Sequence, residues 1–136
     1  MIYLLKLLYW GYSMFPFKSS SDFLEYVKTM EIHTLNCPLS SSLDLISGKW
    51  ELKILFLLLK YDTLRFGEFK KNLPNITNTV LTNVLKKFEK AEVIHRTQFN
   101  EIPPHVEYSL TESGKELIHV FFELAKWGQK ISPAHT

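Results

Sequence analysis

The stretch from Thr77 to Lys90 constrains the fold most, because its apolar and polar residues separate completely at the periodicity of an α-helix. On a helical wheel of about 100° per residue, all the apolar side chains fall within an arc of about 140°. They are Val80, Leu81, Val84, Leu85 and Phe88. The opposite arc holds only amides, hydroxyls and charged groups: Asn78, Thr79, Thr82, Asn83, Lys86, Lys87, Glu89 and Lys90. Since Thr77 is a favourable N-cap, we predict a helix from residue 78 to about residue 91 with one face in a core.

Shorter segments on both sides of this helix complete the fold prediction. In chain order they are a short helix that ends at Gly48, a helix over Trp50–Lys60, a short helix over Phe66–Asn72, strands over Val93–Gln98 and Val106–Leu110, and a last helix over Glu112–Lys130 capped by Thr111. The second of these helices is apolar nearly all round, so we expect it to be central and buried. The order predicts a mostly helical α+β fold, namely a winged helix-turn-helix domain with flanking dimerisation helices.

The positive charge is concentrated in one quarter of the chain. The segment Arg65–Arg96 contains seven basic and three acidic residues, a net charge of +4. The whole chain has a net charge of only +2, so the rest carries −2. Such an uneven distribution is typical of a surface that binds phosphate groups. A solvated, lysine-rich face without a ligand is the alternative.

The polar face of the predicted helix has the chemistry that reads the DNA major groove. Asparagine can donate to and accept from base edges, threonine can reach bases or phosphates, and lysine neutralises the backbone. The candidate groove contacts are Thr77, Asn78, Thr79, Thr82 and Asn83, the candidate phosphate contacts are Arg65, Lys86, Lys87 and Arg96, and the candidate contacts of the hairpin, or wing, are Gln98 and His105. We therefore expect double-stranded DNA as the partner.

Other classes of function have little support in the sequence. The five histidines are scattered without metal-ligand spacing, and no glycine-rich phosphate loop or nucleophile elbow occurs. We expect no enzymatic activity, no metal and no cofactor. A single cysteine excludes an intrachain disulfide. The apolar runs are shorter than the ~20 residues of a membrane span, so we expect no membrane insertion and a cytoplasmic location.

Residues 1–36 differ from the rest and are expected to form an N-terminal extension. Met1–Ser13 is rich in Leu, Tyr, Ile and Trp, and both Met14 and Met30 are possible alternative starts. Three interpretations stay open for these first residues: an over-extended reading frame, a surface-bound amphipathic segment, or an extension that packs in a dimer. A short helix is predicted over Ser21–Met30, and residues 21–36 are candidates for packing in a dimer.

Specific motifs make the chain similar to the HxlR-type transcriptional regulators, which are related to the MarR group. These motifs are Cys37-Pro38-Leu39, Gly48-Lys49-Trp50, Arg65-Phe66-x-Glu68, Leu73-Pro74-x-Ile76, Leu81-Thr82-x-x-Leu85, Pro103-Pro104-x-Val106-Glu107-Tyr108-Ser109-Leu110-Thr111 and Gly114-Lys115. The resemblance covers about Cys37–Gly128. It implies a cytoplasmic, dimeric, sequence-specific DNA-binding regulator, with a winged helix-turn-helix domain over residues 37–130 that includes a C-terminal dimerisation helix.

The last helix supports the dimer independently, because Leu117, Val120, Phe121, Leu124 and Trp127 form a wide apolar stripe. A symmetric dimer would bind a near-palindromic operator. The alternative for the stripe is that it folds back onto the core of the same chain. The alternative for the whole domain is a winged helix that contacts proteins without binding specific DNA. No feature of the sequence points to a particular small-molecule effector.

The sequence departs from the family pattern at several positions. Gly67 stands where a helix-capping serine is usual, and Glu92 stands where a glycine usually ends the recognition helix. Thr79 and His105 replace basic residues at positions expected to face DNA, which lowers the expected affinity at neutral pH. Cys37 is a candidate redox or electrophile sensor, since some relatives use a cysteine at this place. A buried apolar role for its thiol is the alternative.

Overall fold

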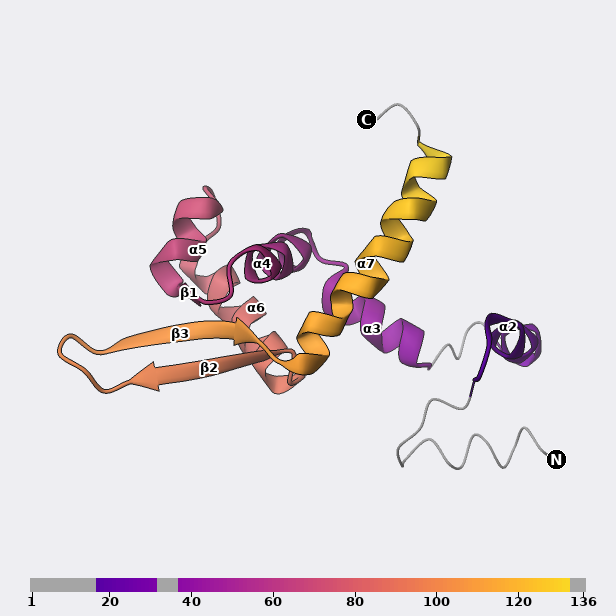
Figure 1. Ribbon diagram of the computed structural model, residues 1–136, viewed down its shortest axis with the longest axis horizontal. Coiled ribbons are helices and arrows are strands. Elements are labelled where there is room, and N and C mark those ends of the chain that lie inside the picture. The colour runs from indigo at the N-terminus through magenta and orange to yellow at the C-terminus, as the bar shows by residue number, and fades with distance from the viewer. Residues whose placement is uncertain (1–16, 32–36, 133–136) are drawn as a thin grey trace. The chain divides into compact units, whose positions relative to one another are not determined.

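The computed structural model describes residues 17–31 and 37–132 (Figure 1). The predictions for Met1–Ser13, and most of those for the extension 1–36, lie outside these residues. The chain forms two compact units, Met1–Ser40 and Ser41–Thr136.

The described part of the first unit contains one complete helix, α2, over Ser20–Thr29. The sequence predicted it from Ser21 to Met30, so the prediction is confirmed to within one residue. Ser19 is the N-cap, and its hydroxyl accepts a hydrogen bond of 3.1 Å from the Asp22 N–H. None of the residues of α2 is buried. Phe17, just before the helix, packs against the rings of Phe23 and Tyr26 at centroid distances of 5.3 and 5.0 Å.

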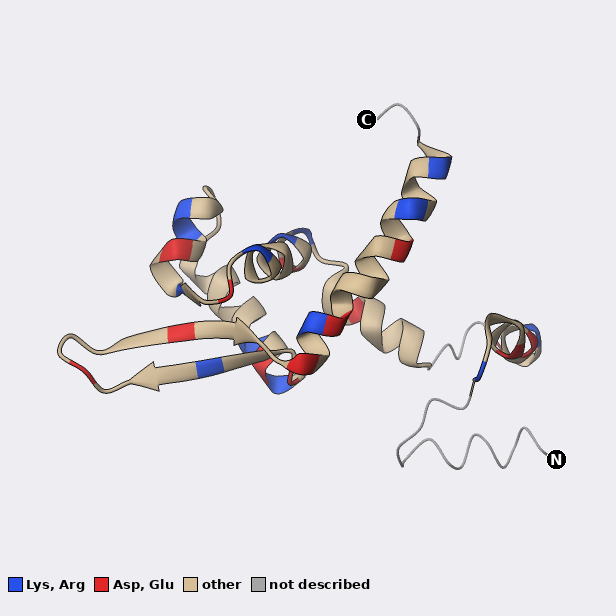
Figure 2. Ribbon diagram, in the orientation of Figure 1, with Lys and Arg blue, Asp and Glu red and all other residues tan. Residues whose placement is uncertain are grey.

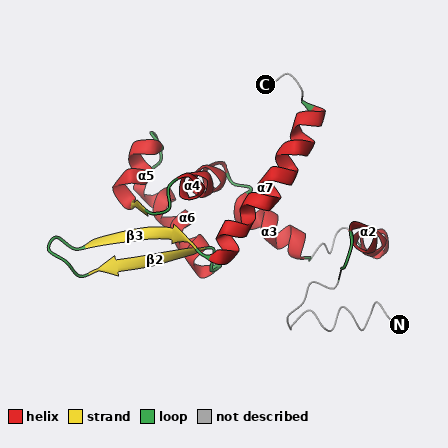
Figure 3. Cartoon of the chain, viewed as in Figure 1, coloured by secondary structure: helices red, strands yellow, loops and turns green. Residues whose placement is uncertain are grey.

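The second unit is the predicted winged helix-turn-helix (Figures 1 and 3). Its elements are α3 over Pro38–Ile46 (which begins at the end of the first unit), α4 over Lys49–Lys60, β1 over Leu64–Arg65, α5 over Phe66–Asn72, α6 over Asn78–Lys90, β2 over Ile94–Phe99, β3 over His105–Leu110 and α7 over Glu112–Ile131. The predicted helices and the two predicted strands are confirmed to within two residues. No helix in the described ranges is both long enough and apolar enough to cross a membrane.

The strands form one antiparallel sheet in the order β1-β3-β2. Strand β3 pairs with β2 from Ile94 opposite Leu110 to Phe99 opposite His105. On its other side it pairs with β1, where Arg65 is opposite Glu107. The sequence did not predict β1, because a strand of two residues has no periodicity. This short strand has a consequence for the site, since it brings Arg65 beside the wing.

The core of this unit is centred on α4, α5 and α6. Five side chains are fully buried there: Ile54, Leu55, Phe69, Leu81 and Phe88. The apolar arc predicted for α6 is confirmed, because four of its side chains are buried and Val80 is half-buried. The prediction that α4 is buried all round is wrong, since Leu52 is 38% and Phe56 47% exposed. The face of α4 that carries them is covered only in part, by Phe121 of α7, whose ring lies 5.2 Å from that of Phe56.

The end of α6 is built around a left-handed residue that is not glycine. Glu92 has φ 57°, and its N–H donates to the carbonyl of Glu89 at 3.0 Å. The next N–H, of Val93, donates to the carbonyl of Phe88 at 2.9 Å. These two bonds form a Schellman motif, in which glycine is the usual left-handed residue. Glu92 therefore adopts the left-handed conformation in which a glycine is usual, and this destabilises the folded protein by about 1 kcal/mol.

The start of α5 corrects the interpretation of Gly67 as a weak cap. The N-cap is Arg65, and Gly67 lies inside the first turn of the helix. Capping is provided from within the helix, because the Glu68 carboxylate accepts the N–H of Arg65 at 2.7 Å. A capping box has two such bonds, one from the N-cap N–H to the third helical residue and one from the third N–H to the N-cap side chain. Only the first can form here, because the guanidinium of an arginine N-cap cannot accept a hydrogen bond.

A glycine allows α7 to approach the sheet closely. The Cβ of any other residue at position 114 would lie 2.2 Å from the carbonyl oxygen of Val93 and 3.0 Å from the Leu110 side chain. The same carbonyl oxygen accepts the backbone N–H of Thr111 at 3.0 Å. The first turn of α7 is thus held against the beginning of the wing by contacts that leave no room for a methyl group.

We predict that Gly114→Ala lowers the free energy of unfolding by about 1–3 kcal/mol, because the new Cβ overlaps a backbone oxygen that cannot move without breaking its hydrogen bond. Gly67→Ala is the matched control. No atom lies within 4 Å of a Cβ at position 67, so removing a helical glycine there should stabilise the protein by about 0.5–1 kcal/mol. Urea denaturation followed by circular dichroism measures both. Equal effects of the two variants would contradict the proposed role of Gly114.

Candidate nucleic-acid interface

The turn between α5 and α6 fixes the two helices of the motif relative to each other. Leu73 and Ile76 are buried at its two ends, and the Ile76 N–H donates to the Leu73 carbonyl at 3.2 Å. Asn75, between them, has φ 80°, a left-handed conformation that asparagine tolerates better than most residues. The Thr77 hydroxyl then accepts the Val80 N–H at 3.1 Å and starts α6 as predicted.

The solvent-facing side of α6 carries most of the predicted groove contacts. Thr77, Asn78, Thr79 and Asn83 are exposed, and Thr82 is half-buried. The Lys70 ammonium, on α5, donates to the side-chain oxygen of Asn78. Because lysine can only donate, this bond fixes the orientation of the Asn78 amide and leaves its NH₂ group for another acceptor. Sequence reasoning missed Lys70, although the Lys70-Lys71 pair just before the turn was a signal for it.

Lys87, a predicted phosphate contact, is bonded to other parts of the protein itself. Its ammonium donates to the backbone carbonyl of Asp44 at 2.9 Å and to the Glu51 carboxylate at 3.1 Å. Both the lysine and the glutamate are partly buried. Lys87 therefore ties α6 to α3 and α4, and its charge is used inside the fold. Its neighbour Lys86 is exposed and, within the described residues, has no acidic group within 4 Å.

A surface hollow of about 260 Å³ lies where α6 meets the sheet. It is lined by Thr82, Leu85, Lys86, Glu89, Arg96 and Tyr108. Two predicted phosphate contacts, Lys86 on α6 and Arg96 on β2, are thus brought to one place. The single acidic group among the lining residues is Glu89. The hollow therefore brings together two cations from different elements.

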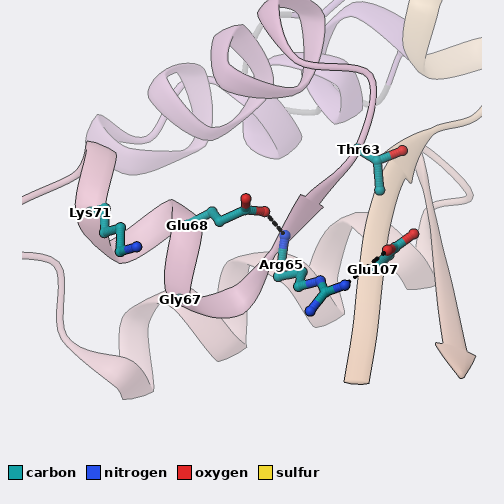
Figure 4. A pocket seen from close by; sticks show the side chains of 6 residues that line it. All are labelled: Thr63, Arg65, Gly67, Glu68, Lys71 and Glu107. Carbon is teal, nitrogen blue, oxygen red and sulfur yellow. Dashed lines mark hydrogen bonds and ion pairs between the residues drawn. The ribbon is translucent and has the colours of Figure 1, made fainter. Parts of the chain in front are cut away.

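The third predicted phosphate contact, Arg65, lines a separate hollow of about 560 Å³ between α5 and β3 (Figure 4). Thr63, Gly67, Glu68, Lys71 and Glu107 complete its lining. The guanidinium of Arg65 points toward Glu107, with 3.8 Å between Nη2 and Oε1. More than half of the Arg65 side chain remains exposed. Arg65 is therefore accessible but already has an acidic partner.

The wing is less basic than the sequence suggested. The tip between β2 and β3 and the middle of β3 both carry an acidic residue (Figure 2). His105 is not an open wing-tip group: its ring stacks on Phe99 at 4.7 Å and lies between the Glu101 and Glu107 carboxylates. This placement does not favour the direct phosphate contact predicted for His105. Gln98, on β2, is exposed and stays a candidate.

The comparisons with known proteins agree with this geometry. The family model described as HxlR-like helix-turn-helix matches residues 45–136. The HTH-type transcriptional regulator YdeP of Bacillus subtilis strain 168 is 44% identical over 94 residues, which are 69% of this chain and 73% of YdeP. The chain belongs to the HxlR-like helix-turn-helix family.

Solved structures extend the agreement to the fold. A regulator assigned to the MarR family, from Enterococcus faecalis V583, matches the HxlR-like chain with a TM-score of 0.66 and 37% identity, over 77% of this chain and 92% of that chain. The redox regulator HypR in its oxidized form matches with a TM-score of 0.61 and 36% identity, over 69% and 96% of the two chains. The HxlR-like domain is therefore a winged helix-turn-helix of a transcriptional regulator.

Within this HxlR-like domain, ten of the eleven predicted site residues separate into three groups, and the eleventh, Gln98, is an exposed residue of β2. Thr77, Asn78, Thr79, Thr82 and Asn83 share the outward side of α6. Lys86 and Arg96 share one hollow, and Arg65 lines another. Lys87 and His105 are engaged with acidic groups of the protein itself.

Proposed function

We propose that this HxlR-like protein acts in the cytoplasm as a homodimer that binds a specific, near-palindromic operator in double-stranded DNA. The observation that carries the proposal is the outward side of α6, where amides and hydroxyls are presented by a helix whose other side is fully packed. A helix held in this way can enter the major groove as a rigid body.

The side chains of α6 divide into base and phosphate contacts. Asn83 is exposed and can bond to an adenine edge through both atoms of its amide. Asn78 is oriented by Lys70, so it contributes donors in a fixed direction. Lys86, Arg96 and Arg65 provide charge for the backbone on either side of the groove. Thr77, Thr79 and Thr82 supply shorter contacts along the same side of α6.

The dimer is supported by apolar surface that the monomer leaves in solvent. On α7, Val120, Leu124 and Trp127 are each half or more exposed. Phe121, predicted as part of the same stripe, instead packs inward and meets Phe56 edge-on at 5.2 Å. Leu117 is half-buried against the core. One edge of the stripe therefore lies in the core of the chain, and the exposed remainder is available to a second copy.

A redox response is a second candidate, because the similar protein HypR is a redox regulator. The residue concerned is Cys37, directly before α3, and only 2% of it is exposed. An oxidant must be able to reach the sulfur of a cysteine that responds to it. In the state described here the thiol is shielded, so a response requires that Cys37 first become accessible.

The first prediction concerns the division of contacts on α6. Asn83→Ala should reduce the discrimination between a selected operator and random DNA by about 1–3 kcal/mol, the scale of a lost bidentate base contact. Lys86→Ala should weaken binding to both DNAs similarly and lower the salt slope by about one unit. Lys87→Met is the matched control and should keep the wild-type slope, since its ammonium is used inside the fold.

Selection of bound DNA from a random pool supplies the operator for this experiment, and fluorescence anisotropy at several salt concentrations measures the affinities. An equal loss on both DNAs for Asn83→Ala would contradict a base contact. A folded wild-type protein that binds no duplex DNA would favour the alternative of a protein-interaction module.

The second prediction concerns assembly. Leu124→Lys should weaken dimerisation by about tenfold, because a charge would enter an apolar interface. His119→Lys, which adds the same charge on an exposed position of α7, should leave the dimer intact. Sedimentation velocity at micromolar protein measures both. A wild-type protein that sediments as a monomer would refute the dimer.

The third prediction concerns Cys37. With a single cysteine, any disulfide must link two protomers, so non-reducing electrophoresis after diamide treatment detects it directly. Because the Cys37 thiol is shielded, we expect diamide to form no cross-link in the native protein. In urea, where the chain unfolds, the thiol should react with diamide rapidly. A native cross-link that abolishes DNA binding, and that is absent in Cys37→Ser, would establish the redox response instead.

A further inference from the structure

Arg65, Glu107 and His105 form a connected cluster at the junction of α5 with the sheet. The Arg65 Nη2 atom lies 3.8 Å from Glu107 Oε1, and the same oxygen lies 3.2 Å from His105 Nε2. The other ring nitrogen of His105, Nδ1, is 3.8 Å from Glu101 Oε2. One carboxylate oxygen is thus shared between a cation of the DNA interface and an imidazole that faces a carboxylate at each nitrogen.

The exposed fraction of the side chains increases from His105 through Glu107 to Arg65, the residue expected to contact DNA. The His105 side chain is 17% exposed, that of Glu107 28% and that of Arg65 55%. The ring of His105 is also held by stacking on Phe99, with 16° between the planes. A phosphate group can therefore reach Arg65, whereas His105 acts on it only through Glu107.

We propose that Glu107 is an inhibitory positioning residue of the DNA interface, and that protonation of His105 relieves the inhibition. This inference rests on the proposed function, since it concerns how Arg65 meets a DNA phosphate. While His105 is neutral, Arg65, Glu107, Glu101 and His105 together carry a charge of −1, and a phosphate at Arg65 is repelled by the adjacent carboxylate. A second proton on the imidazole brings the sum to zero.

The size and the pH range of the effect follow from simple electrostatics. An imidazole ordinarily gains its second proton near pH 6.5. One unit of charge several ångströms from a phosphate, partly screened by solvent, changes affinity by about three- to tenfold. The remaining charged groups that face the cluster are Lys71 and Glu68 on α5, and the Glu68 carboxylate already accepts the Arg65 N–H (Figure 4).

The test measures binding of the full-length protein to a random-sequence 30-base-pair duplex at pH 6, 7 and 8 and constant ionic strength. Wild type should bind about three- to tenfold more tightly at pH 6 than at pH 8. Glu107→Gln should bind more tightly than wild type at pH 8, by a similar factor, and lose most of the pH dependence. His105→Gln should match wild type at pH 8 and remain weak at pH 6.

Two controls make the same chemical changes outside the cluster. His95→Gln removes an exposed imidazole from β2, and Glu116→Gln removes an exposed carboxylate from α7. Both should keep a clear pH dependence, and Glu116→Gln should not tighten binding at pH 8. Circular dichroism establishes that each variant is folded. If Glu107→Gln fails to fold, Arg65→Gln provides the second test, because it should lower affinity at pH 6 and lose the pH dependence.

The inference is overturned if folded Glu107→Gln binds no more tightly than wild type at pH 8, or if His105→Gln keeps the wild-type pH profile. In either case wild type still binds DNA, so the proposed function survives. A folded wild-type protein that binds neither this duplex nor DNA selected from a random pool at any pH overturns both.

Discussion

The carbonyl group of Val93 joins the three elements on which the function depends. Its oxygen accepts the Thr111 N–H at 3.0 Å and the Thr111 hydroxyl at 3.1 Å. The same hydroxyl lies 2.7 Å from the Glu92 carbonyl and accepts the Gly114 N–H at 3.0 Å. Val93 directly follows the end of α6 and precedes the wing, and Thr111 is the N-cap of α7. The recognition helix, the wing and the proposed dimerisation helix therefore meet at one set of hydrogen bonds.

This junction explains why an unfavourable residue conformation is tolerated at Glu92. The left-handed turn aims Val93 into the core while its N–H completes the Schellman motif. In the proposed dimer the same junction has a mechanical role, because α7 sets the distance between protomers and α6 is fixed to the start of α7. In that dimer, the packing of α7 therefore contributes to the spacing of the two recognition helices.

The sequence predicted the parts of the site that depend on local periodicity. The two-sided pattern of α6 defined its buried and outward faces correctly, since both follow from about 3.6 residues per turn. Lys87 lies at the edge of the polar arc on that pattern, and its partners are 43 and 36 residues away. Contacts of this range leave no local signal. For the same reason the two-residue strand β1 and its placement of Arg65 opposite Glu107 were not predicted.

The net charge of the segment Arg65–Arg96 overestimates the number of basic side chains that are available to DNA in the folded protein. Lys87 is paired with Glu51, and Arg65 lies beside Glu107. Within the described residues, Lys86 and Arg96 are the predicted phosphate contacts that have no acidic group within 4 Å. Non-specific affinity grows with the number of phosphates neutralised, so a single domain with few available cations binds random DNA weakly. Under the proposed function, recognition then depends on base contacts from α6 and on simultaneous binding by the two protomers of the proposed dimer.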